Sequence, residues 1–431
     1  MKVVARWGTT ALLVAAMLGA GTDAAQAQVT FEQTVTALGN DDPDVRLQAV
    51  QALKASALPE AALPLTRALA DPVDRIQLEA IAAELNLFLA ERIVPRRRVG
   101  LVIEVRNSIS ALSIFEQGGA ALDARPVPVG VLTALRGTIR DDNQRVAVEG
   151  LYAFGALAEN VYGAERQALL AASAEDLASA LAMDAAEVRA AALRVINRVY
   201  AWRVGDAAVN ERVGDAVIDA MNAREATLRL AAMDTLGALR FERGIQALTD
   251  QFQHYQKGTV AQAALGALAR VAHPSSAPVF TSALASRDLG VKLAAVEGLA
   301  RIGDVAQAAT ITTALAKDRS DAVQLGGAFA AVLLSDGPID EIVGALAKDR
   351  LRDQAMQYLV DAAPGRARIF SPHAEDPQPR IRTLVVTALG LSGDPGAQSI
   401  VERYLKDADP TVARTAARAV ARLQGVAATT R

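Results

Sequence analysis

One short sequence pattern recurs along most of this chain, from about Asp41 to Gln424. Each copy begins with a turn that contains Asp and often Pro, continues with Val-Arg or a close variant, and ends in an alanine-rich segment. The clearest copies are DDPDVRLQAVQAL (41–53), DPVDRIQLEAI (71–81), RDLGVKLAAVEGLARIG (287–303) and DADPTVARTAARAVARL (407–423). Because self-similarity at a short period is typical of stacked repeats, we predict a solenoid and not a compact globule.

The spacing of the copies predicts two helices in each unit. An Arg-like residue opens the second helix of each unit, and from Arg229 onward these residues recur every 28 to 33 positions. About 30 residues hold a helical hairpin with two short turns. The aligned residues are Arg46, Arg75, Arg145, Arg189, Arg229, Gln262, Lys292, Gln324, Gln354, Arg382 and Arg414. Strand-like alternation does not persist, so the predicted fold class is all-α.

These features resemble the HEAT repeat family, in particular its short bacterial form, the HEAT-like repeat also seen in phycobilin lyases. The resemblance rests on the Asp-x-x-Val-Arg turn, as in Asp42–Arg46 and, with Lys, Asp288–Lys292. It implies an α-solenoid, a right-handed superhelix of stacked helical hairpins. It also implies a ladder of Asp and Arg residues between successive units, so we expect most of these Arg residues to have a structural role and fewer to contact a ligand.

The signature also predicts how the second helices begin. The Asp side chain can cap the helix N-terminus, and Pro43, Pro72 and Pro410 suit the first helical turn. Small residues then follow at the spacing of a buried stripe, as at Val291, Ala294, Ala295 and Leu299. Eleven such units at about 10 Å each predict a curved rod near 100 Å long.

The N-terminus has the features of an export signal, predicted as residues 1–27. Lys2 and Arg6 precede an apolar stretch over 9–20, and Ala25-Gln26-Ala27 is a small-residue cleavage site. Twelve apolar residues are too few to span a bilayer. We therefore predict cleavage after Ala27 and a periplasmic or secreted protein, with an uncleaved membrane anchor as the alternative.

The net charge and the absence of cysteine limit the kinds of partner that this chain is expected to bind. The chain has 45 basic and 48 acidic residues, and removing residues 1–27 leaves 43 (45 − 2) and 47 (48 − 1), a net charge near −4. This balance does not favour general nucleic-acid binding or attraction to an anionic membrane. The chain has no cysteine, so neither disulfides nor a lipid-modified N-terminal Cys is available.

The repeat rhythm is broken once. The predicted organisation is N-terminal repeats at 28–91, an irregular insertion at 92–130, the main array at 131–425 and a short tail at 426–431. For the insertion we predict a long helix over 97–117 followed by a loop at 118–129, with a β-excursion at 99–105 as the alternative. Such breaks often protrude and bind a partner, although a simple packing irregularity is equally consistent with the sequence.

Known catalytic patterns are absent from the sequence. His254, His273 and His373 fall in different repeats, and no cysteine can assist them at a zinc site. No Gly-x-Ser-x-Gly elbow or phosphate-binding Gly-rich loop occurs. We therefore predict no catalytic, cofactor-binding or metal-binding residues and no cofactor.

Candidate partner-binding residues are basic or aromatic, because Trp, Tyr and Arg anchor many interfaces. They are Arg96, Arg97, Arg98, Tyr200, Trp202 and Arg203, and a role of the aromatic residues in the core is the alternative. The function that we predict is a non-enzymatic scaffold that binds a protein or peptide along the concave surface of the solenoid. The alternative, suggested only by the shared repeat, is a lyase or lyase subunit of the bilin-lyase type.

Overall fold

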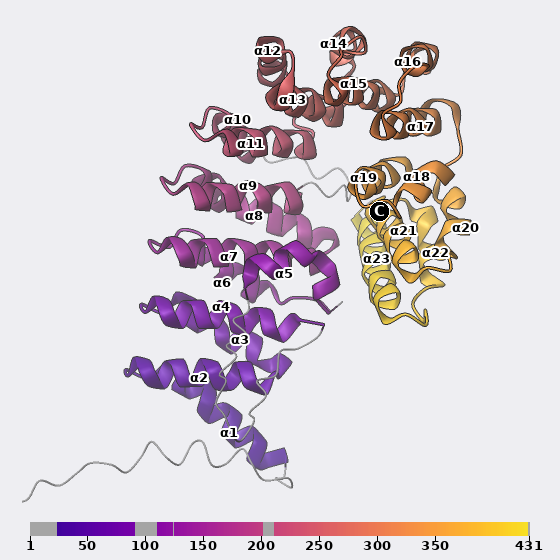
Figure 1. Ribbon diagram of the computed structural model, residues 1–431. Helices are drawn as coiled ribbons and strands as arrows, with labels where there is room; N and C mark the ends of the chain where they lie inside the picture. Colours follow the sequence, from indigo (N-terminus) through magenta and orange to yellow (C-terminus); the bar gives the residue numbers. More distant parts are fainter. Residues whose placement is uncertain (1–23, 91–109, 124, 201–210, 430–431) are drawn as a thin grey trace, which may run out of the picture.

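The computed structural model describes residues 24–90, 110–123, 125–200 and 211–429, and its helices form a stack of hairpins (Figure 1). Within these ranges no strand is present, and the sole β-bridge joins Leu89 and Leu122. The predicted all-α solenoid is therefore confirmed.

Each unit pairs an outer first helix with an inner second helix. The first helices are α1(Ala24–Ala37), α3(Ala62–Leu65), α6(Val129–Thr138), α8(Gly163–Leu181), α10(Glu211–Ala220), α12(Ile245–Tyr255), α14(Ala277–Ala283), α16(Gln307–Leu315), α18(Asp340–Ala345), α20(Ser371–Ala374) and α22(Gln398–Glu402). The second helices are α2(Pro43–Ser56), α4(Asp74–Phe88), α7(Gln144–Leu157), α9(Ala186–Tyr200), α11(Ala226–Leu239), α13(Gly258–Val271), α15(Leu289–Ile302), α17(Asp321–Ser335), α19(Arg352–Ala362), α21(Pro379–Leu391) and α23(Pro410–Thr429). One additional helix, α5(Ala111–Gln117), belongs to the insertion.

The helix starts follow the predicted capping chemistry. Asp42 accepts a hydrogen bond from the backbone N–H of Asp44 at the start of α2, and Asp288 caps α15 in the same way. Pro43 and Pro410 are the first residues of their helices, where a missing N–H is harmless. The prediction for Pro72 is wrong, because α4 begins at Asp74 and Pro72 lies in the preceding turn.

Alanine and leucine side chains bury the contact between successive second helices. Ala294 and Ala295 on α15 are 5% and 0% exposed, and helices α13, α15 and α17 pack side by side. Small side chains let neighbouring helix backbones approach closely, and each layer then contacts mainly the next one.

The insertion differs in detail from its prediction. Its described helix, α5, is shorter than the one predicted over 97–117, and the 3₁₀ turn η4(Gly118–Ala121) follows it directly. The alternative β-excursion at 99–105 lies outside the described residues. Helix α5 packs on α7, with the Phe115 ring 5.2 Å from the Tyr152 ring.

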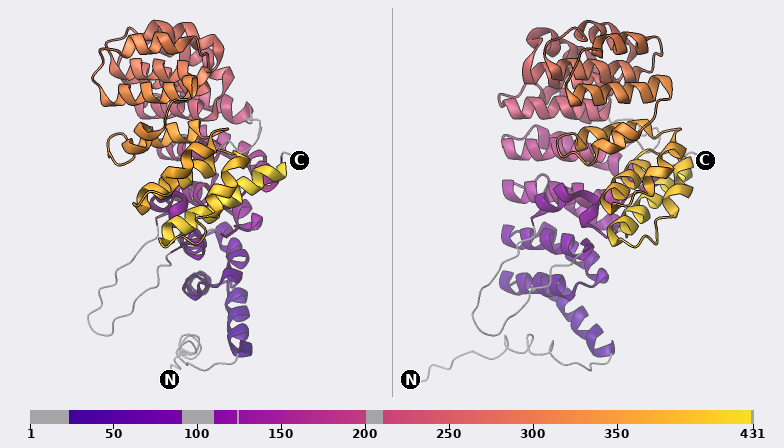
Figure 2. Two further views of the ribbon diagram at one scale, coloured as in Figure 1. Left: turned by 90° about the vertical axis from the view of Figure 1, so that its right-hand side faces the viewer. Right: turned by 45° about the vertical axis from the view of Figure 1, so that its right-hand side comes forward.

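The stack curls back on itself. Its last helix, α23, packs against α8 and η4, so the units from α6 to α23 form a closed ring (Figures 1 and 2). Helices α1 to α4 extend from this ring as a short arm. The predicted rod is therefore wrong in shape, because the rotation between neighbouring units accumulates until the C-terminal unit meets the middle of the chain.

Candidate functional site

A ladder of polar links joins successive units along one edge of the solenoid. At the first junction, Arg46 donates from Nε to Asp71 Oδ2 over 2.7 Å and from Nη2 to Oδ1 over 3.0 Å. Asp71 also accepts from the backbone N–H of Val73, so one carboxylate joins the helix of one unit to the turn of the next. Equivalent links are Gln77–Asp141, Lys292–Asp318 and Arg382–Asp407. The ladder implied by the family resemblance is present at these junctions. Gln262 donates instead to Asp288, which is itself the cap of α15.

The register of this ladder corrects several positions of the alignment. In the second unit the donor is Gln77 and not Arg75. The N–H of Gln77 bonds the carbonyl oxygen of Val73, as the N–H of Arg46 bonds that of Asp42. The ladder residue is therefore the fourth residue after the cap. By the same backbone bond this residue is Ala147, Ala355 or Ala413 in three other units, so the alignment of Arg145, Gln354 and Arg414 is also wrong.

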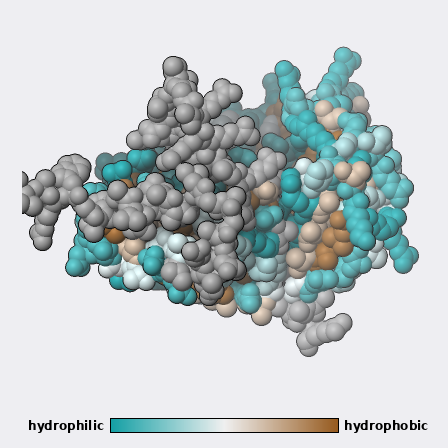
Figure 3. Space-filling view, turned by 90° about the horizontal axis from the view of Figure 1, so that it is seen from below, coloured by the Kyte–Doolittle hydropathy of each residue, from teal (hydrophilic) through white to brown (hydrophobic). Residues whose placement is uncertain are grey.

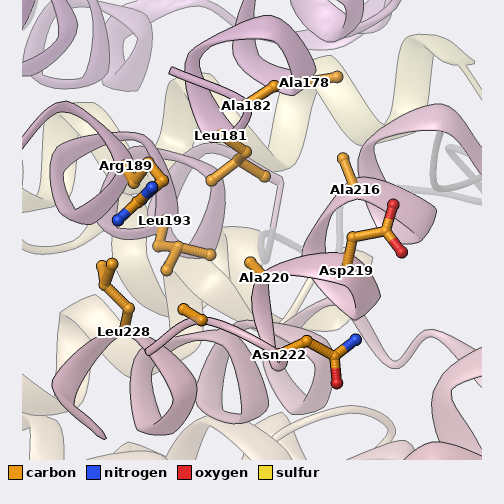
Figure 4. Close-up of a pocket in the computed structure, with 11 residues that line it drawn as sticks. Ala178, Leu181, Ala182, Arg189, Leu193, Ala216, Asp219, Ala220, Asn222 and Leu228 are labelled. Atoms are coloured by element: carbon orange, nitrogen blue, oxygen red, sulfur yellow. The ribbon is translucent and has the colours of Figure 1, made fainter. Parts of the chain in front are cut away.

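A pocket of about 250 Å³ opens between the α8–α9 and α10–α11 units (Figure 4). The pocket exists because many of its lining positions hold alanine, whose side chain is too small to fill the space. Apolar lining comes from Ala178, Leu181, Ala182, Leu193, Ala216, Ala220, Ala223 and Leu228. Its polar lining comes from Arg189, Asp219 and Asn222, with Arg189 on the opposite side of the view from the other two.

Ion pairs cross the concave side of the ring. Asp361 on α19 accepts from Arg301 on α15 over 2.8 Å and from Arg240, which follows α11, over 3.1 Å. On the same side, the Tyr358 hydroxyl donates to Glu297. These links join helices that are not neighbours in the stack, so side chains bridge the concave surface here.

A second polar cluster closes the ring. Arg418 on α23 donates to the carbonyl oxygen of Leu122 and, over 3.4 Å, to Asn160 Oδ1. Arg422, one turn later, lies 3.7 Å from Glu159. Burial lowers the pKa of Arg422 to about 10. The end of the insertion, η5(Ala158–Asn160) and α8 together provide the docking surface for the C-terminal helix.

Sequence reasoning missed this role of the insertion, although a signal was present. Arg414, Arg418 and Arg422 are four residues apart and therefore form one basic stripe on the final helix. Arg418 and Arg422 of this stripe make the contacts that close the ring.

The predicted partner-binding residues are not brought together among the described ranges. Arg96, Arg97, Arg98, Trp202 and Arg203 all lie outside them. Tyr200 is 9% exposed, and its hydroxyl donates to the carbonyl oxygen of Leu170 over 2.6 Å. Burial raises the pKa of Tyr200 to about 12. Little of Tyr200 is therefore left for a partner, and binding by the other residues stays a prediction.

One face of the molecule is mostly polar where its residues are described (Figure 3). Seen from below, hydrophobic residues appear in small separate groups (Figure 3). Among the described ranges, no three His, Cys, Asp or Glu side chains converge as a metal ligand set would. His254, His273 and His373 lie in α12, before α14 and in α20, in different layers as predicted. No helix in the same ranges combines the length and hydrophobicity of a transmembrane span.

Comparison with known proteins supports the repeat assignment. The sequence model of HEAT repeats matches residues 256–330 and 369–430, which include α13 to α16, the first part of α17, and α20 to α23. No curated protein matches the chain. The resemblance predicted from the Asp-x-x-Val-Arg turn is thus confirmed for these two segments.

Several solved structures are similar to the chain. They include an engineered protein (18% identity, 92% of this chain and 98% of that one, TM-score 0.43). Others are Kap95p in a study of its binding to RanGDP (14%, 90% and 50%, TM-score 0.36) and importin beta (16%, 92% and 51%, TM-score 0.35). This chain spans about half the length of the last two. By its helices this protein is an all-α solenoid, and two of its segments match the HEAT repeat model.

Proposed function

We propose that this protein is a non-enzymatic scaffold that binds a protein or peptide partner on its concave surface. The observation that carries the proposal is the stack of helical hairpins itself, in which inner helices present a long side-chain surface. HEAT-repeat segments in the chain support the same class of function. No contact among the described residues favours the bilin-lyase alternative.

We propose the N-terminal arm as the part of the concave surface that binds the partner. Ion pairs of Asp361 cross the ring, whereas α1 to α4 extend beyond the level at which α23 meets α8 (Figure 2). On α2, the exposed residues follow a helical stripe of Asp44, Gln48, Gln51 and Ala55. Leu78 and Ala82 on α4 are half-buried. A polar stripe beside partly exposed apolar side chains is suited to a peptide or helix of a partner.

We also propose that the protein is exported, as the signal-like features of residues 1–27 predict. Expression in a bacterial host, with cell fractionation and N-terminal sequencing, tests this part. The expected product is in the periplasm or medium and starts at Gln28. A cytoplasmic product that retains Met1 or Lys2 would overturn it.

Partner capture from envelope extracts tests the scaffold role. Gln51→Arg places a long charged side chain on the α2 stripe and should release a partner that wild type retains. Gln253→Arg makes the same change on the outer helix α12, where Gln253 is exposed, and should leave capture unchanged. Equal capture by the two variants would contradict the placement on the arm, and no capture by wild type would contradict the scaffold role.

A further inference from the structure

One turn position has the same chemistry in most units. The residue two before the helix cap accepts a hydrogen bond from the N–H of that cap, which orders the turn. Seven units place a polar side chain there, namely Asn40, Asp71, Asp141, Ser286, Asp318, Asp376 and Asp407. In two consecutive units this position holds Met183 and Ala223. Their register follows from the bonds Arg189 N–H to Ala185 carbonyl and Arg229 N–H to Glu225 carbonyl.

Because this turn position is Ala223 and not Asp, the ladder residue Arg189 has no carboxylate acceptor at that position of the next unit. Arg46 and Arg382 each use Nη1 for carbonyl groups of their own turn, and Nε with Nη2 for both oxygens of the next unit's Asp. Arg189 keeps the first contact, from Nη1 to the carbonyl oxygen of Met183 over 3.3 Å. Its Nη2 donates to the half-exposed Glu225 over 3.1 Å. Its Nε is buried and has no acceptor among the described residues.

Ala223, which stands where other units have an Asp carboxylate, lines the pocket in Figure 4. Arg189 and Ala223 both line this pocket, and the remaining lining is mainly alanine and leucine. Its volume of about 250 Å³ is below the roughly 300–1,000 Å³ of drug-sized sites. A buried guanidinium N–H without an acceptor is unfavourable, and a carboxylate is its best-matched acceptor.

We infer that this pocket binds a small carboxylate with a short aliphatic body. The carboxylate takes the place of the absent ladder Asp and accepts from Nε of Arg189, while the aliphatic part contacts Leu181, Leu193 and Leu228. Asp219 and Asn222 are exposed and lie across the pocket from Arg189 (Figure 4). The same group can come from a free carboxylic acid or from the C-terminal leucine of a polypeptide.

Calorimetric titration of the full chain separates these sources. The free-acid probe is 4-methylpentanoate, with 4-methylpentanamide as its neutral control. The polypeptide probe is an acetylated tripeptide ending in leucine with a free carboxylate, with the same peptide amidated as its control. One charge-assisted pair and a few buried carbons predict roughly millimolar affinity for at least one carboxylate, at least tenfold above that of its amide.

The variant Ala223→Asp provides an internal replacement for the ligand. It restores the acid that other units have, so it should raise the thermal denaturation midpoint and weaken carboxylate binding at least tenfold. Ala309→Asp, on the exposed face of α16, is the matched control and should leave binding unchanged. The proposal is overturned if neither carboxylate binds wild type at concentrations of about 10 mM. It is also overturned if amides bind equally, or if folded Ala223→Asp binds as wild type does.

Discussion

Arg418 on the last helix donates a hydrogen bond to the carbonyl oxygen of Leu122, 296 residues earlier in the chain. This contact joins the C-terminal unit to the end of the insertion. Arg418 also reaches Asn160, which in turn donates to the carbonyl oxygen of Asp123. The end of the insertion therefore helps to complete the ring, by joining the C-terminal unit to the middle of the chain.

Arg418→Ala should open the ring. The change leaves the carbonyl of Leu122 without its donor and should destabilise the closed form by about 2–3 kcal/mol, as for loss of a buried hydrogen bond to a charged group. Amide exchange is expected to accelerate at 118–123 and 158–163, and the radius of gyration from X-ray scattering should increase. Arg403→Ala removes an exposed ion pair as a control. Unchanged exchange at both segments would show that closure does not depend on Arg418.

The ladder should make stability sensitive to acid. The hydrogen bond from Arg382 lowers the pKa of Asp407, and that from Lys292 lowers the pKa of Asp318. Because the folded pKa lies below the unfolded value near 3.8, this stabilisation is complete above pH 3.8 and is lost as pH falls through the folded pKa.

The variant Asp407→Asn tests that dependence. Its denaturation midpoint in urea should lie below that of wild type at neutral pH, and the difference should shrink in acid. Asp353→Asn, at an exposed position of α19, should match wild type throughout. A difference that is constant with pH would exclude an ionised Asp407 as its source.

Glu84 is expected to destabilise the fold at neutral pH. Its side chain is 0% exposed, and neither carboxyl oxygen has a hydrogen-bond partner among the described residues. Burial raises the pKa of Glu84 well above 4.5. Stability therefore falls as pH rises above 4.5, because the unfolded chain ionises while the folded chain retains the proton.

Replacement by a residue of similar size should relieve this cost. Glu84→Met is expected to stabilise the protein at pH 7 by roughly 1–3 kcal/mol, the cost of leaving a buried polar group without a hydrogen bond. The gain should decline toward pH 4.5, and thermal denaturation across this range measures it. Glu165→Met, at an exposed position of α8, is the control. A stabilisation that does not vary with pH would contradict the assignment of a buried neutral carboxyl.

Ala295→Glu should damage the stack locally. Ala295 is 0% exposed between α15 and its neighbours, so a carboxylate there is buried without a partner and costs several kcal/mol, on the order of 3–5. Faster hydrogen exchange is expected mainly in α13, α15 and α17. The exposed site Ala309→Glu should show little change. Equal loss of protection in every unit would refute nearest-neighbour coupling along the stack.

Much of the candidate site was beyond sequence reasoning. The alignment placed Arg189 correctly at the start of a second helix, but Ala223 looked like any other alanine in an alanine-rich chain. Its meaning depends on register, which only the backbone hydrogen bonds of Arg189 and Arg229 define. Likewise, Asp361 lies in α19, and nothing in its local sequence indicates that it binds two arginines. These are Arg240, which follows α11, and Arg301 on α15.

The sequence by itself determined the repeated helical hairpin, because caps such as Asp42 and buried stripes such as Val291 to Leu299 act within one unit or between neighbours. Only the tertiary structure decided that the stack closes into a ring and that a pocket opens beside Arg189. The overall curvature is the sum of small rotations over many interfaces, and no local pattern encodes that sum. The contact between Arg418 and Leu122 exists because those rotations bring the two ends of the ring together.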